Sequence, residues 1–132
     1  MTGHERNELI EAARQTRENA VASFSGFKVG AALRTSAGRI LGGCNVENCT
    51  YGLTVCAERV ALLTALAAGE RAFEAVAVVT DSRSPSTPCG PCRQLLWEYC
   101  GDIEVILANL DGSVIEYRLS DLLPHPFEFR KA

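Results

Sequence analysis

Three cysteines lie at spacings that could hold a metal ion. Cys89 and Cys92 form a Cys-x-x-Cys pair in the stretch PCGPCR, and Cys56 stands earlier, in TVCAER. A Cys-x-x-Cys pair at a turn entering a helix can bind one metal ion with both sulfurs. Three protein ligands with an open fourth position are typical of catalytic zinc, which lowers the pKa of its water to about 7. We therefore expect one Zn²⁺ per chain at Cys56, Cys89 and Cys92.

The residues that follow Cys56 could assist such an ion. Glu58 stands two residues later, where its carboxyl group can face the metal without ligating it and can move protons. An isolated glutamate at a helix start more often complements the helix dipole, but the neighbouring cysteines favour catalysis here. Three thiolates leave a zinc ion with a net charge of −1. Arg59, and as a second candidate Arg93, could donate hydrogen bonds to the sulfurs and offset that charge.

Other interpretations of the cysteines remain open. Six cysteines in 132 residues could form a disulfide framework, although the apolar content of 47% makes such cross-links unnecessary. Cys89 and Cys92 could instead be a redox pair, or belong to a structural zinc site, which needs a fourth protein ligand. Cys44 and Cys100 have no partner at metal-site spacing, and we interpret them as small buried residues. His4 and His125 show no ligand spacing either.

The elements that must position these side chains can be predicted from periodicity. Helical spacing predicts helices at 7–20, 56–69 and 92–101, with a short turn at 120–123. Apolar, β-branched runs predict strands at 28–35, 39–46, 73–80, 103–110 and 113–119, the first two as a hairpin. This order predicts an α/β fold, with one mixed sheet of about five strands and helices on both faces, in a single domain over 1–132. Both cysteine stretches fall at helix starts, where ligands bind in such sheets.

Composition excludes several classes of protein. The net charge is −3 and the basic residues are scattered, which argues against a nucleic-acid partner. The sequence has no run of about 18 apolar residues, so we expect no membrane span. The N-terminal stretch MTGHERNELIEAARQ is charged from its fourth residue and does not look like a signal peptide, which predicts a cytoplasmic protein.

The motifs together resemble the small homotetrameric cytidine deaminases. They run from SGFKVGAAL through GCNVEN, YGLTVCAER and PCGPCRQ to LLPHPF, so the resemblance covers nearly the whole chain. The order Cys-x-Glu, then Pro-Cys-x-x-Cys, is a zinc deaminase signature. The resemblance implies hydrolysis of cytidine and deoxycytidine to uridine and deoxyuridine with release of ammonia, in pyrimidine salvage. It also implies that Glu58 is the catalytic acid and base.

The resemblance further implies how the nucleoside is bound. Phe27 would pack on the pyrimidine, Ala57 would place its backbone near the base, and Asn45 and Glu47 would hydrogen-bond the ribose. An amide and a carboxylate two residues apart on a strand also share a face on chemical grounds alone. Tyr51 and Phe127 would reach a neighbouring subunit's site, so the expected homotetramer has shared active sites. The predominantly apolar helix from Val60 to Ala68 independently favours burial against a partner.

The sequence also departs from the family pattern. Ser23-Phe24 stands where Pro-Tyr is common, and Cys49 where alanine or serine is common. These changes affect the expected substrate preference and leave the reaction unaffected. The alternatives are a deaminase of a related aminopyrimidine nucleoside, such as blasticidin S or a base-modified cytidine, and a non-catalytic zinc module. The second alternative would not need Glu58.

Overall fold

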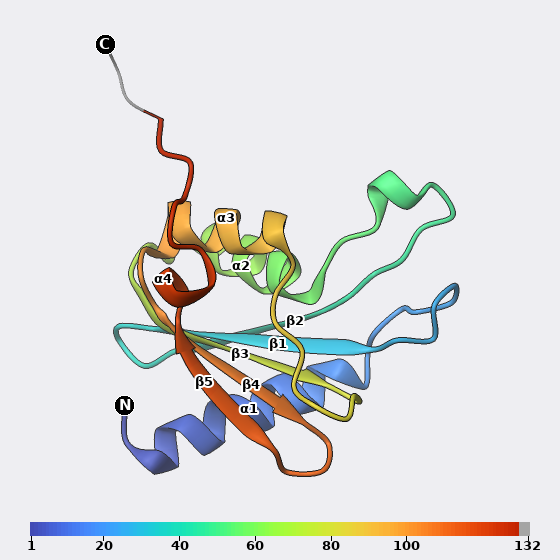
Figure 1. Ribbon diagram of the computed structural model, residues 1–132, viewed down its shortest axis with the longest axis horizontal. Coiled ribbons are helices and arrows are strands. Elements are labelled where there is room, and N and C mark those ends of the chain that lie inside the picture. Colours follow the sequence, from blue (N-terminus) through green and yellow to red (C-terminus); the bar gives the residue numbers. More distant parts are fainter. Residues whose placement is uncertain (130–132) are drawn as a thin grey trace.

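The computed structural model describes residues 1–129, which form a five-stranded sheet between helices (Figure 1). The elements in chain order are α1 (Gly3–Arg17), β1 (Val29–Thr35), β2 (Ile40–Cys44), a 3-10 turn η1 (Tyr51–Leu53), α2 (Ala57–Ala67), β3 (Phe73–Thr80), α3 (Gly90–Cys100), β4 (Glu104–Asn109), β5 (Val114–Arg118) and α4 (Leu119–Leu122). No helix among these residues is long and apolar enough to cross a membrane.

The sheet is mixed, with strand order β2-β1-β3-β4-β5. β1 pairs antiparallel with both β2 and β3, β3 pairs parallel with β4, and β4 pairs antiparallel with β5. β2, β3 and β4 therefore run in one direction, and β1 and β5 in the other. α1 covers one face, while α2 and α3 cover the other (Figure 1). The predicted fold class, a mixed five-stranded sheet with helices on both faces, is confirmed.

The three central strands β1, β3 and β4 are buried on both faces, so they contribute to two separate core layers. Successive side chains of a strand point to opposite faces. In β3, Val76 and Val78 join the layer beneath α2 and α3, whereas Ala75 and Ala77 join the layer against α1. The small alanines on the α1 side leave room for Leu9, which is fully buried.

Two glycines let the helices approach the sheet closely. A Cβ added to Gly30 in β1 would lie 1.9 Å from the Ala13 carbonyl oxygen of α1. A Cβ added to Gly43 in β2 would lie 2.4 Å from the Ala61 nitrogen of α2, on the other face. Real Cβ atoms do not come this near to backbone, so both positions need glycine for close approach of a helix.

One edge of the sheet gathers the segments that carry the cysteine motifs. Gly30, near the start of β1, is opposite Cys44 at the end of β2 and Val79 near the end of β3. β2 leads into α2 and β3 leads into α3, so both helices begin at this edge. Since the carboxyl ends of parallel strands are where open α/β sheets bind ligands, the topology places both cysteine stretches at such a position.

Several element boundaries differ from the predicted ones, and the starts of α1 and α3 have clear physical causes. α1 begins at Gly3, four residues before the predicted start, because Thr2 and Glu5 form a capping box there, and it ends at Arg17. α3 begins at Gly90, with Cys89 as its N-cap and Pro91 in its first turn. Proline suits the first turn, where its missing N–H costs no hydrogen bond, so the helix extends back through PCGPC.

Candidate metal centre and substrate cavity

The three predicted thiols converge at this edge of the sheet. The sulfur atoms of Cys56, Cys89 and Cys92 all lie within 4.8 Å of one another. The Cys56 and Cys89 sulfurs are 3.9 Å apart, and those of Cys89 and Cys92 are 3.0 Å apart. Two thiolates on a tetrahedral zinc ion are separated by about 3.8 Å, given Zn–S bonds of about 2.3 Å. A disulfide requires about 2.05 Å, so the cluster fits a metal ion better than a bridge.

Helix N-termini surround the sulfurs with partial positive charge. Cys56 is the N-cap of α2 and Cys89 is the N-cap of α3, and neither side chain makes a capping hydrogen bond. The free backbone N–H groups of both first turns favour thiolates. A hydrogen bond from Cys92, opposed by partial burial, lowers the pKa of Cys56 to about 6. The same hydrogen bond together with burial raises the pKa of Cys92.

Glu58 and Arg59 accompany the sulfurs at the start of α2. Glu58 is only 5% exposed, and burial raises the pKa of its carboxyl group above the ordinary value. A raised pKa suits a group that both takes and returns a proton near neutral pH. Burial lowers the pKa of the Arg59 guanidinium, but the Cys92 thiol beside it and the three sulfur charges produce a net increase. Arg59 thus lies where the sequence predicts a cation near the thiolates.

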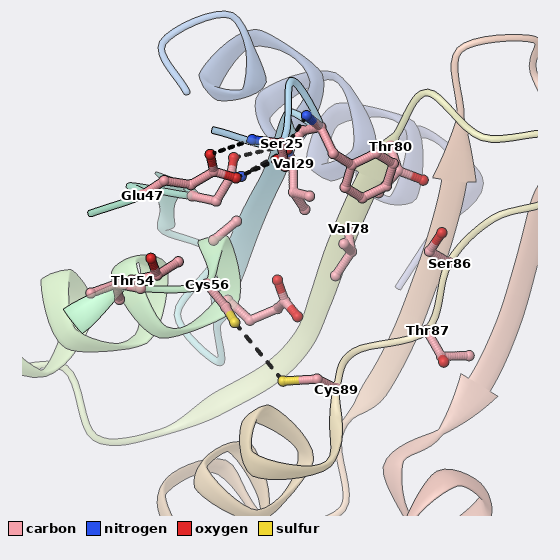
Figure 2. Close-up of a pocket in the computed structure, with 15 residues that line it drawn as sticks. Ser25, Val29, Glu47, Thr54, Cys56, Val78, Thr80, Ser86, Thr87 and Cys89 are labelled. Carbon is pink, nitrogen blue, oxygen red and sulfur yellow. Dashed lines mark hydrogen bonds between the residues drawn. The ribbon is translucent and has the colours of Figure 1, made fainter. Parts of the chain in front are cut away.

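A cavity of about 280 Å³ opens beside the sulfurs, close to the lower end of small-molecule pockets (Figure 2). Figure 2 shows Cys56 and Cys89 facing each other, with Ser86 and Thr87 on one side and Ser25 and Glu47 on the other. Seven of the predicted site residues line it: Phe27, Asn45, Glu47, Cys56, Ala57, Glu58 and Cys89. Eight further residues line it: Ser25, Val29, Thr54, Val55, Val78, Thr80, Ser86 and Thr87.

Asn45 and Glu47 shape one wall by binding the segment before β1. The Asn45 side chain accepts a hydrogen bond from the Val29 N–H (2.9 Å) and donates one to the Phe27 carbonyl (2.8 Å). The Glu47 carboxylate accepts from the N–H groups of Phe24 (2.9 Å) and Ser25 (3.0 Å), and from the Ser25 hydroxyl. These hydrogen bonds lower the pKa of Glu47, and the bond from the Ser25 hydroxyl contributes most. Glu47 is therefore a carboxylate at neutral pH.

Arg93 does not donate to the sulfurs, so that part of the sequence interpretation is wrong. Its guanidinium donates to the Pro88 carbonyl (2.7 Å), the Leu122 carbonyl (2.8 Å) and the Thr87 hydroxyl (2.9 Å). Arg93 therefore fixes the loop that precedes Cys89, including a wall of the cavity. The sequence offered one signal for Ser86 and Thr87, their position immediately before the Pro-Cys-Gly-Pro-Cys motif.

Tyr51 and Phe127 are not among the described residues that line the cavity. Tyr51 is 78% exposed in the 3-10 turn after β2, and Phe127 is 71% exposed beyond α4. Each side chain is thus available to another molecule.

Cys44 and Cys100 are half-buried, and burial raises the pKa of Cys100 to about 12, consistent with a small internal side chain without chemical function.

Comparisons with known proteins agree with this geometry. Residues 4–108 match the family model described as "Cytidine and deoxycytidylate deaminase zinc-binding region". The chain is 48% identical to a cytidine deaminase of Halalkalibacterium halodurans, over 93% of this chain and 94% of that protein. It is 31% identical to a blasticidin-S deaminase of Bacillus cereus, over 73% of this chain and 74% of that protein. The crystal structure of a cytidine deaminase from Burkholderia pseudomallei superposes with a TM-score of 0.90 at 52% identity, covering 96% of this chain and 100% of that one.

Proposed function

The chain belongs to the cytidine and deoxycytidylate deaminase family, and we propose that it hydrolyses cytidine and deoxycytidine to uridine and deoxyuridine with release of ammonia. The observation that supports this best is a buried glutamate that lines a cavity of about 280 Å³ beside three converging thiols. The remaining assignments follow from that arrangement.

The cofactor is one zinc ion per chain, and Cys56, Cys89 and Cys92 are its proposed ligands. A zinc ion bound by three protein ligands acts as a Lewis acid that makes water a nucleophile at neutral pH. The chain supplies the sulfurs from two helix N-termini, whose dipoles stabilise the thiolates. Arg59 adds the positive charge of its guanidinium beside the three sulfurs.

Glu58 is the proposed acid and base of the reaction. Its carboxylate takes a proton from the attacking water and delivers it to ring N3, so that C4 becomes electrophilic. The carboxylate then takes a second proton, from the hydroxyl group added at C4, and delivers it to the exocyclic amine, so that C4 becomes a carbonyl as ammonia leaves. Its burial keeps water away and favours the protonated form, which the second half of the reaction requires.

The walls of the cavity suit a pyrimidine nucleoside. Phe27 offers an aromatic surface for the base, and Ala57 is at the start of α2 with its N–H free for a base oxygen. Asn45 uses one donor and one acceptor within the chain and keeps one of each for a ribose hydroxyl. The Glu47 carboxylate can accept from a hydroxyl as well.

A free nucleoside suits this cavity better than a nucleotide. None of the fifteen lining residues is a lysine or arginine, whereas Glu47 and Glu58 both line it. A 5′-phosphate would meet carboxylates without a compensating cation, which raises its free energy in the site. We therefore expect deamination of cytidine in strong preference to its monophosphate.

The blasticidin-S deaminase relative makes a second substrate class worth testing. Such an enzyme would use the same sulfurs and glutamate, so only the outer walls would differ. A non-catalytic zinc module is the weaker alternative, since it would not explain an acid buried beside the cluster and lining a cavity.

We further propose a cytoplasmic homotetramer acting in pyrimidine salvage, with no nucleic acid as a partner. Exposed apolar side chains at Tyr51, Leu63 and Phe127 support burial against other copies. Tyr51 and Phe127 would then complete a neighbouring cavity. The proposed domain covers 1–132, of which residues 130–132 lie outside the described part.

The test is loss of ultraviolet absorbance and release of ammonia on incubation with separate nucleosides. Cytidine and deoxycytidine should both react, cytidine monophosphate should react far more slowly, and zinc should be present at about one ion per chain. Turnover of blasticidin S with no reaction of cytidine would favour the second substrate class. Absence of turnover on all of them, with zinc present, would favour the non-catalytic module.

A further inference from the structure

The segment after α4, residues 123–129, forms an extended arm that passes α3 (Figure 1). We call it the C-terminal arm. At its start, Arg93 donates to the carbonyl of Leu122 (2.8 Å). Further along, the next residue of α3, Gln94, binds Phe127. Two consecutive residues of one helix thus hold the end of α4, from which the arm starts, and one point within the arm.

The contact between Gln94 and Phe127 resembles a pair of strand hydrogen bonds. The Gln94 side-chain Nε2 donates to the Phe127 carbonyl (2.8 Å), and the Phe127 N–H donates to Gln94 Oε1 (3.0 Å). The amide group uses its donor and its acceptor on a single residue, so it fixes both the position and the direction of the backbone there. Phe127 as a whole residue remains 71% exposed. Gln94 therefore holds the backbone of Phe127 while the side chain of Phe127 stays accessible to another molecule.

We propose that Gln94 is a positioning residue, which holds Phe127 in place for the substrate cavity of a second copy of this chain. The inference rests on the proposed function, in which Phe127 completes a neighbouring site. Gln94 follows the proposed metal ligand Cys92 by two residues on the same helix, so the anchor of the arm and the sulfur cluster share one helix. A flexible arm would have to be ordered with each substrate bound, which weakens binding.

The first experiment compares steady-state kinetics of Gln94→Ala with a matched control. Loss of two exposed neutral hydrogen bonds should raise KM about threefold to tenfold while kcat and zinc content stay close to wild type. The control is Glu98→Ala, an exposed site one turn further along α3. Gln94→Glu keeps the acceptor but faces the Phe127 carbonyl with an oxygen, so it should also raise KM. An unchanged KM in Gln94→Ala would overturn the proposal.

A double-mutant cycle with Phe127→Ala separates positioning from general stability. If Gln94 acts through Phe127, the variant carrying both changes should have the KM of Phe127→Ala alone. If the KM increases of the two single variants instead multiply in the double variant, Gln94 acts elsewhere than through Phe127, and the proposal is overturned. An unaltered KM in Phe127→Ala would also overturn the proposal, and it would refute the shared active site as well.

Hydrogen exchange of the Phe127 amide gives a readout that does not depend on the reaction. The exchange rate should rise in Gln94→Ala and stay unchanged in Glu98→Ala, because only Gln94 accepts from that N–H. Equal exchange in wild type and Gln94→Ala would overturn the anchor itself. If the wild-type protein deaminates nothing, the proposed function fails, and this measurement still decides whether Gln94 holds the arm.

Discussion

The residues at the sulfur cluster and the exposed aromatic side chains of the chain differ in how far they are buried. Cys92 and Ala57 are fully buried and Glu58 is 5% exposed, all in the first turn of a helix, while Cys56 is half-buried and Cys89 is the exposed member of the cluster. Phe24 and Tyr51 meet edge to face with ring centroids 6.4 Å apart, yet they are 56% and 78% exposed.

We interpret this difference as a division between the groups proposed for the chemistry and the groups proposed to enclose a substrate. Cys92, Ala57 and Glu58 are packed within the chain. Phe24, Tyr51 and Phe127, in contrast, expose large apolar surfaces. Surfaces of that kind are usually covered by another molecule. We therefore expect one chain to hold the proposed reaction centre and a second copy to complete the walls of the cavity. Four experiments test this comparison.

Cys89→Ala should have the largest effect, because it removes one of three thiols. We expect zinc content to fall well below one ion per chain and deaminase activity to become undetectable, measured by metal analysis and absorbance assay. Cys49→Ala is the matched control, as Cys49 is exposed and stands outside the cluster. Full zinc retention by Cys89→Ala would remove Cys89 from the ligand set.

Glu58→Gln should keep zinc and fold while losing most of its turnover. General acid–base groups contribute about 10²–10⁴ in rate, and two proton transfers pass through this one carboxyl, so we expect the upper end. The measurement is kcat for cytidine, with zinc content and circular dichroism as checks. Turnover near that of the wild type would exclude Glu58 as the acid and base.

Phe127→Ala should raise KM about tenfold, because stacking of a base on an aromatic ring is worth about 1–3 kcal/mol. Mixing it with Glu58→Gln under conditions that exchange subunits should restore part of the activity. A site with a normal Glu58 from one chain and a normal Phe127 from the other then becomes possible. Mixed oligomers that regain no activity would contradict shared sites.

Leu63→Glu should have the smallest effect within a single chain, because Leu63 is 55% exposed on α2. In an oligomer the same change places a charge in an apolar contact, so light scattering should report smaller particles. Leu110→Glu is the control, a 40% exposed leucine before the turn between β4 and β5. An intact oligomer in Leu63→Glu would place the interface elsewhere than α2.

The prediction from sequence succeeded where signals are local or strongly periodic. The runs FEAVAVVT and IEVILANL predicted the buried strands β3 and β4, since apolar, β-branched residues fit a sheet covered on both faces. Errors occurred at helix ends, as at α1, where Thr2 and Glu5 cap the helix earlier than its apolar spacing indicates.

The sequence by itself determined the set of thiols, the acid beside them and the order of helices and strands, because these depend on spacing along the chain. Only the tertiary structure decided that Asn45 holds Val29, 16 residues away, and that Gln94 holds Phe127, 33 residues away. Such partners depend on where strands end and on how closely helices approach the sheet. No local pattern encodes those distances, because hydrogen bonds between distant segments form only once the core has packed.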